Sequence, residues 1–176
     1  MTRREAPADP PLQPIELLGV LTAHAVDYVV IGGYSLAAHG YVRGTKDVDV
    51  VPDPGRENLG RLLSALSKLG AEPLAIGDFG SDELLPLTLD NLALGGNWLL
   101  RTSLGRLDVM QYVEGLHSYG RLRDRALVTE LPGFEAAVPF AGYDDLVALK
   151  RASARDQDLL DIAGRIPEHR AGPPPP

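Results

Sequence analysis

The sequence predicts an α/β protein, built on a small mixed β-sheet with helices packed on one face and a helical segment at the C-terminal end. Three observations predict this class. A strand, a glycine pair, a short helix and a second strand follow one another between Val29 and Val51. Leucines then recur at helical spacing over 56–69, which indicates an amphipathic helix. Two strand-like stretches, 98–103 and 106–113, flank Gly105 as in an antiparallel pair.

The predicted domain covers residues 14–166, and its last part, 142–166, is the C-terminal helical segment. Residues 1–13 are polar and proline-rich, and residues 167–176 end in four prolines. Neither stretch carries enough apolar surface to build a core, so we expect a disordered arm and a disordered tail. The first helix of the domain is expected over 14–25, where apolar side chains form a stripe.

The composition limits the classes of function. The chain has 176 residues, which is enough for one domain with a sizeable core. It has no cysteine, so disulfide frameworks and thiolate metal sites are excluded. No apolar run approaches ~20 residues, and the first residues lack the apolar core of a secretory signal, so we expect a cytoplasmic protein without a membrane span. The net charge of −7 argues against a broad surface for nucleic acid but leaves a local basic groove open.

The glycine pair and the helix after it have the features of a phosphate site. Gly32 and Gly33 follow an apolar strand directly. Because they have no Cβ, the chain can turn sharply there and a ligand can approach the main chain. A short helix is expected over 34–39, ended by Gly40. Its first N–H groups would point at a phosphate lying above the turn.

The next strand, 46–51, carries two carboxylates on one face. Side chains alternate along a strand, so Asp47 and Asp49 share one face while Val48 and Val50 point into the core. The Cα atoms of the two aspartates would stand about 7 Å apart, and such a pair can share hard cations such as Mg²⁺. The alternative is the solvated face of an edge strand. The order of strand, glycine pair, short helix and acidic strand favours the metal site.

A third acid, Asp108, is expected in the middle of the strand 106–113. Leu107 and Val109 face one side of this strand, and Arg106 shares the other side with Asp108. One interpretation is a salt bridge with a nearby arginine. The other is a third carboxylate of the metal site, which acts as general base toward an incoming hydroxyl or does the same work as a metal ligand. Trp98 could stack on a base, but a core tryptophan is the default interpretation.

Two regions leave alternatives open. Residues 71–96 are interrupted by glycines and prolines, so we expect loops with one short helix or strand. Residues 118–125 contain Arg121, Arg123 and Arg125. These arginines spread around the axis if the segment is helical and form one basic edge if it is extended. A solvated charge run is the first interpretation, and contact with an RNA backbone is the alternative.

The glycine pair, the short helix after it and the acidic strand together resemble the first motif of the DNA polymerase beta-like nucleotidyltransferase superfamily. The residues that carry the resemblance are Gly32-Gly33-Tyr34-Ser35-Leu36-Ala37, Gly40 and Arg43-Gly44-Thr45-Lys46-Asp47-Val48-Asp49. Within the superfamily the chain is most similar to the AbiEii type nucleotidyltransferase toxins and their MenA-like relatives, and it also resembles the lincosamide-type antibiotic nucleotidyltransferases. The resemblance covers most of the chain and implies the nucleotidyltransferase fold.

The resemblance implies transfer of a nucleoside monophosphate from an NTP to an acceptor hydroxyl. Asp47 and Asp49 would hold two Mg²⁺ ions, and Asp108 would complete the metal site as the third catalytic acid. The residues implied in nucleotide binding are Gly32, Gly33, Ser35, Arg43, Thr45, Lys150, Arg155 and Asp158. The closing motif of the AbiEii-like branch, in which a lysine reaches the phosphates, is resembled by Lys150, Arg155 and Asp158 together with Asp161. An exposed helix with i,i+3 and i,i+4 ion pairs is the alternative.

The AbiEii-like branch further implies a toxin that adds nucleotides to tRNA 3′ ends, and usually a separately encoded antitoxin as partner. A second hypothesis keeps the enzyme and changes the acceptor to a small antibiotic or a protein hydroxyl. A third is a non-catalytic nucleotide-binding module that keeps the fold. Acids in the middle of a strand are costly without a use, which favours the two enzyme hypotheses.

Overall fold

The computed structural model describes residues 9–75, 84–134, 136–153 and 162. The strands are β1 (Tyr28–Ile31), β2 (Asp47–Pro52), β3 (Glu72–Pro73), β4 (Asn97–Thr102), β5 (Gly105–Met110), β6 (Leu127–Glu130) and β7 (Ala137–Phe140). The helices are α1 (Pro14–Ala23), α2 (Gly32–Ala38), α3 (Arg56–Lys68), α4 (Leu89–Ala93), α5 (Tyr119–Asp124) and α6 (Tyr143–Ser153).

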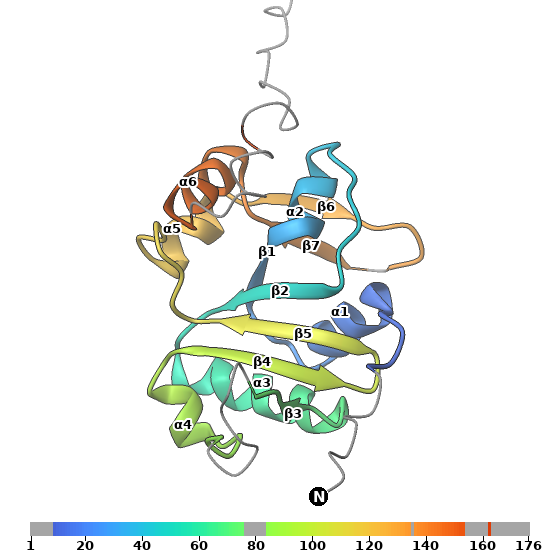
Figure 1. Cartoon of the computed structure of the whole chain (residues 1–176), viewed down its shortest axis with the longest axis vertical. Coiled ribbons are helices and arrows are strands. Elements are labelled where there is room, and N and C mark those ends of the chain that lie inside the picture. Colours follow the sequence, from blue (N-terminus) through green and yellow to red (C-terminus); the bar gives the residue numbers. More distant parts are fainter. Residues whose placement is uncertain (1–8, 76–83, 135, 154–161, 163–176) are drawn as a thin grey trace, which may run out of the picture.

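The strands form one seven-stranded sheet in the order β3-β4-β5-β2-β1-β7-β6 (Figure 1). Strand β2 lies in the middle, antiparallel to β1 and parallel to β5. The pair β1–β7 is also parallel, and the remaining pairs are antiparallel. The predicted class, a mixed sheet with packed helices and a C-terminal helical segment, is confirmed. The helices cover both faces of the sheet and not one as predicted, because strand β1 is apolar on both sides.

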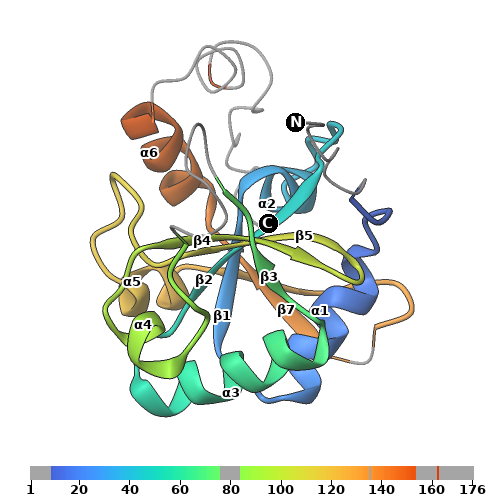
Figure 2. The same cartoon turned by 60° about the horizontal axis from the view of Figure 1, so that its bottom comes forward.

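One face of the sheet is covered by α1, α3 and α4, which lie below the sheet in Figure 2. The leucine stripe of α3 produces this contact, since Leu59, Leu62 and Leu66 are all buried against the sheet. Burying side chains of this size contributes roughly 1.5–3 kcal/mol each. Trp98 of β4 belongs to the same core, as the default interpretation had it.

The opposite face carries α2, α5 and α6, and α2 and α6 lie above the sheet in Figure 2. Its core includes Val29, Ile31, Leu122, Leu146 and Leu149. Strand β1 is buried on both sides, because the run Tyr-Val-Val-Ile has no polar residue to turn toward water. Helix α6, from the C-terminal segment, therefore shares this face of the sheet with α2 and α5.

The conformation of the two regions that the sequence left open, 71–96 and 118–125, includes a capped helix in each. Segment 118–125 is helical, because the Ser118 hydroxyl accepts a hydrogen bond from Arg121 N at 3.2 Å and Leu122 is buried on the inner side. Within 71–96, Thr88 caps α4 in the same way, through Asn91 N at 3.2 Å. This region therefore contains both a short helix and a two-residue strand.

The described end of the N-terminal arm contacts the sheet. Asp9 forms an ion pair with Arg101 at 2.9 Å, and Gln13 N donates to Leu104 O at 2.9 Å. Leu12 packs against the first core. Residues 9–13 are thus held although the sequence placed them in a disordered arm, because one apolar side chain and the strand connection give them partners. The predicted tail, 167–176, lies outside the described residues.

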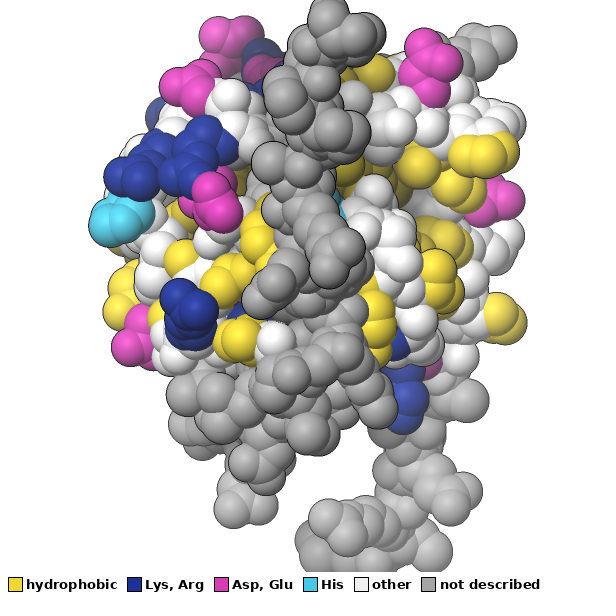
Figure 3. Space-filling model, turned by 90° about the horizontal axis from the view of Figure 1, so that it is seen from above, with side chains coloured by type: hydrophobic (Ala, Val, Ile, Leu, Met, Phe, Trp, Pro, Cys, Tyr) yellow, Lys and Arg dark blue, Asp and Glu magenta, His cyan; other side chains and the backbone are white. Residues whose placement is uncertain are grey.

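The face above the sheet has a mixed surface. Lys and Arg side chains occur there in small separate groups beside acidic and apolar ones, as Figure 3 shows. None of the helices in the described part of the chain is long and apolar enough to cross a membrane.

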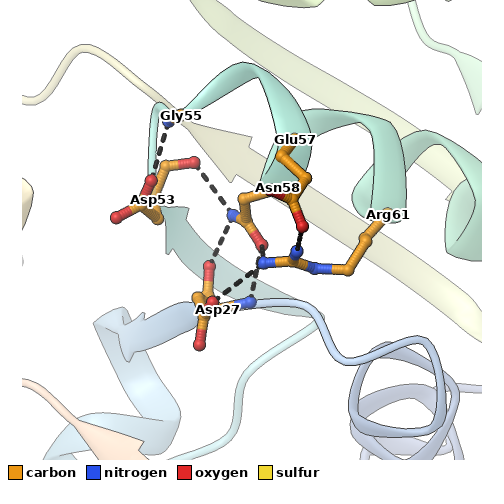
Figure 4. Close-up of polar contacts among 6 residues, drawn as sticks. All are labelled: Asp27, Asp53, Gly55, Glu57, Asn58 and Arg61. Carbon is orange, nitrogen blue, oxygen red and sulfur yellow. Dashed lines mark hydrogen bonds and ion pairs between the residues drawn. The ribbon is translucent and has the colours of Figure 1, made fainter.

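A polar network ties α3 to the ends of β1 and β2 (Figure 4). Asn58 is 3% exposed, and its Nδ2 donates to the carbonyls of Asp27 and Asp53, both at 2.9 Å. Its Oδ1 accepts from Asp27 N at 2.7 Å and from Arg61 Nη2 at 3.3 Å. Arg61 also pairs with the Glu57 carboxylate at 2.9 Å. Every polar atom of the buried Asn58 amide is therefore satisfied.

Candidate functional site

The parallel pairing of β2 with β5 brings the predicted acids together. In this register Asp49 lies opposite Asp108, and Asp47 lies opposite Arg106. Neighbouring strands are about 4.8 Å apart, so Asp49 and Asp108 are direct cross-strand neighbours. Asp47 and Asp49 are both half-buried. The three carboxylates that the sequence singled out thus start from one small area of the sheet.

The alternation of side chains explains why they share a face. Val48, Val50, Leu107 and Val109 point into the core below the sheet. The residues between them must then point to the opposite face, where α2 and α6 lie. The predicted alternation along both strands is confirmed.

Asp108 is in an unusual environment for a carboxylate. Its side chain is buried, and its Oδ1 has no hydrogen-bond partner among the described residues. Burial and, second, the charge of Asp47 raise the pKa of Asp108 from 3.8 to about 6, although Arg106 acts in the opposite direction. The site therefore contains a carboxyl group that titrates not far below neutral pH.

The glycine turn lies directly against Asp49. Gly32 has a φ of +66°, a conformation that residues with a side chain rarely adopt. A Cβ at this position would also collide with Asp49 Oδ2. Only glycine allows the start of α2 and the Asp49 carboxylate to approach this closely.

Thr45 links the next glycine to Asp47. A Cβ at Gly33 would lie 2.9 Å from the Thr45 Cβ, so the threonine packs onto the bare main chain. The Thr45 hydroxyl donates toward Asp47, with its oxygen 3.1 Å from both the Asp47 Oδ1 and the Asp47 carbonyl oxygen. Thr45, predicted as a nucleotide-binding residue, thus orients the Asp47 carboxylate in this structure.

The other predicted nucleotide-binding residues have different surroundings. Ser35 is fully buried, and its hydroxyl donates to the Ala141 carbonyl at 3.1 Å, so it ties α2 to the strand end before α6. Arg43 is half-buried in the loop between α2 and β2. Lys150 is 6% exposed and lies on α6, which packs against α2. Arg155, with Asp158 and Asp161, lies outside the described residues.

The acidic face matches a divalent cation in the kind of its donor atoms but not in their placement. As the side chains are placed, no group of three or more His, Cys, Asp or Glu residues in the described part of the chain could hold a metal ion. The donors nevertheless match a hard cation in kind, because they are carboxylate oxygens. One of them, Asp108 Oδ1, is buried and has no hydrogen-bond partner within 9–75, 84–134, 136–153 and 162. The residues therefore fit Mg²⁺ in the kind of donor atom they supply.

Two further residues at this site were not singled out from the sequence. Arg106 is half-buried beside Asp47, and its Nε is buried without a hydrogen-bond partner among the described residues. Burial and the charge of Asp47 raise the pKa of the Tyr34 hydroxyl on α2. The signal for Arg106 was present, since it stands two residues before Asp108 and therefore on the same face of the strand.

The chain matches no protein-family model, and no curated protein is similar to it at a significant level. Two solved structures are similar in part. The solution structure of the antibiotic-resistance factor ANT(2″)-Ia is 16% identical, with a TM-score of 0.44, over 76% of this chain and 67% of that one. The crystal structure of ANT(2″)-Ia in complex with adenylyl-2″-tobramycin is 14% identical, with a TM-score of 0.45, over 74% and 68%. At this level of similarity, a function for this protein has to rest on its own residues.

Proposed function

We propose that this protein is a metal-dependent nucleotidyltransferase, which transfers a nucleoside monophosphate from an NTP to an acceptor hydroxyl and releases pyrophosphate. One observation carries the proposal. Asp49 and Asp108 stand opposite each other on β2 and β5, and one oxygen of the buried Asp108 has no hydrogen-bond partner in the part of the chain that the structure describes. Such an arrangement is unfavourable in a folded protein unless a cation or a substrate proton uses it.

Asp47, Asp49 and Asp108 are the residues that would hold Mg²⁺, as two ions. When bound, these ions neutralise phosphate charge and orient the reacting groups. The Thr45 hydroxyl holds the Asp47 carboxylate in place for this task.

Asp108 serves the acceptor. It would act as general base toward the attacking hydroxyl, directly or as a metal ligand that does the same work. On the other side of Asp49, the Gly32-Gly33 turn gives the triphosphate access to the main chain at the start of α2. Arg43 from the loop and Lys150 from α6 would offset the charge that develops on the phosphates.

The 3′ end of tRNA is the proposed acceptor, in line with the resemblance to the AbiEii-like branch, and a cognate antitoxin is the proposed partner. The surface sets a limit on this interaction. The described basic residues on the upper face occur in small groups (Figure 3). Because the net charge of the chain is −7, RNA contact would be local, near the reacting end, and not spread over a broad basic surface.

The test is to incubate the protein with each labelled NTP, Mg²⁺ and one acceptor at a time. Total tRNA, a panel of aminoglycosides and lincosamides, and a protein extract are the three acceptor classes. Label on tRNA supports the proposal in full. Label on a drug or on protein retains the nucleotidyltransferase and replaces the acceptor. Tight NTP binding with no transfer to any acceptor would instead identify a non-catalytic nucleotide-binding module.

A further inference from the structure

Arg106 is a cation on the face of the sheet that carries the three acids. It has no role in the proposed nucleotide transfer as described above. It lies opposite Asp47 and two residues before Asp108 on the same side of β5. Its position is therefore set by two strands at once, and it is fixed relative to both acids.

The Nε of Arg106 is buried and has no hydrogen-bond partner among the described residues, although the charge of Arg106 lowers the pKa of Asp108. A neighbouring arginine behaves differently. Arg101, directly opposite Arg106 on β4, is 22% exposed and its Nε forms an ion pair with Asp9 at 2.9 Å. A half-buried guanidinium with an unsatisfied N–H is costly, and an anion that accepts a hydrogen bond from it would offset that cost.

The sheet order places Arg106 on the acceptor side of the site. Arg106 lies on β5, and the Gly32-Gly33 pair follows β1, on the other side of β2. Strand β2 thus separates Arg106 from the glycine pair, at about two strand spacings or ~10 Å. Asp108, the acid proposed to serve the acceptor, is only about 7 Å from Arg106 along the same strand.

We propose that Arg106 binds a phosphate group that the acceptor carries next to its reacting hydroxyl. This inference rests on the proposed function, because it takes Asp108 as the acceptor side. A guanidinium binds phosphate through two parallel hydrogen bonds, and this contact is both strong and directional. The acceptor class is then a nucleotide hydroxyl, at the end of an RNA or in a free nucleoside monophosphate. An aminoglycoside that carries no phosphate would make no such contact with Arg106.

The experiment measures binding without NTP, so that it does not depend on turnover. The probes are a short single-stranded RNA with a free 3′ hydroxyl and, separately, a free nucleoside 5′-monophosphate, each titrated at several salt concentrations. For Arg106→Gln we expect about tenfold weaker RNA binding or more, and a salt slope smaller by about 0.7, the value for one lost phosphate contact on a single strand. Arg106→Lys should restore the slope and part of the affinity.

Arg101→Gln is the matched control, since this arginine is a strand neighbour already paired with Asp9, and we expect its affinity and salt slope to stay close to wild type. Equal weakening for both probes would assign the contact to the terminal nucleotide, and weakening for RNA alone would assign it to a phosphodiester. Unchanged affinity and slope in Arg106→Gln would overturn the inference, as would a wild-type protein that binds neither probe. Transfer of label by a protein whose RNA binding ignores Arg106 would refute this inference and keep the proposed function. Arg106-dependent binding without any transfer would support the phosphate contact and refute the proposed function.

Discussion

Two polar regions lie at opposite ends of the β1–β2 pair, and they differ in how their polar atoms are satisfied. At one end, the buried Asn58 amide makes four hydrogen bonds and closes the network of Asp27, Asp53 and Arg61 (Figure 4). At the other end, Asp108 is buried with an oxygen that has no partner among the described residues, near the charge of Asp47.

The difference separates a structural role from a functional one. A satisfied buried amide stabilises the fold and leaves nothing for a ligand to use. A buried carboxylate that repels its neighbour destabilises the fold, and it is retained where a cation or a proton acceptor is needed. Substitutions in the Asn58 network should therefore change stability alone, while those among the acids should remove activity without loss of stability.

The largest expected effect is on activity. Asp49→Ala should lower the rate of nucleotide transfer by at least about 10³-fold, or ~4 kcal/mol in transition-state stabilisation, because a metal-holding carboxylate is lost. Circular dichroism should show an intact fold. Asp90→Ala, which removes an exposed acid on α4, is the control and should keep its activity. Full activity in Asp49→Ala would show that the metal site is assigned to the wrong residues.

The second effect is on stability. Asn58→Ala leaves the Asp27 N–H and two carbonyls without their buried partner, so we expect a loss of about 3 kcal/mol in the free energy of unfolding. Urea denaturation measures this loss, and the transfer rate of the remaining folded protein should not change. Asn91→Ala, at a more exposed amide, should shift stability by less than about 0.5 kcal/mol. A large fall in transfer rate per folded molecule would contradict the division between the two regions.

The third effect depends on pH. Because the pKa of Asp108 is about 6 in the folded state and 3.8 as the ordinary value, the folded state binds more protons between these pH values. Metal-free wild-type protein should therefore lose stability as pH rises through this window, by on the order of 2–3 kcal/mol. Asp108→Asn removes the titrating group, so it should be more stable than wild type at pH 7 and equal to it below about pH 4. Thermal melts in EDTA test this. If Asp108→Asn is less stable than wild type at pH 7, the surroundings of Asp108 do not disfavour its charged form.

The smallest effect is expected at the edge of the structural network. Glu57 is 92% exposed and pairs with Arg61 one helical turn away. Glu57→Gln should cost less than about 0.5 kcal/mol in urea denaturation, and the difference should vanish at high salt. A loss as large as that of Asn58→Ala would mean that the charged rim, and not the buried amide, holds the network together.

Much of the fold could be predicted from local patterns. Leucine spacing predicted the helix over 56–69, and α3 occupies 56–68. Alternation predicted the inward valines and outward acids of β2. The predictions were incomplete where a single cap decides the conformation, as at Ser118, because one hydrogen bond to Arg121 N selects helix over strand there.

The candidate site could be predicted only in part. Asp47 and Asp49 stand out because an acid pair on an apolar strand is visible in the sequence. The Asn58 network carries no such signal, since a single asparagine on a helix looks like a solvated residue until its partners from β1 and β2 are known. Arg106 was overlooked for the same reason, since the burial of its Nε without a hydrogen-bond partner among the described residues is a property of its surroundings.

The sequence by itself determined which way each strand residue points, because side-chain direction follows from the alternation of the backbone within one strand. It also determined the need for glycine in the turn. Only the tertiary structure established that Asp108 lies opposite Asp49 and Arg106 opposite Asp47. The register between two parallel strands joined by a long connection depends on how both pack against the helices, and no local pattern contains that information.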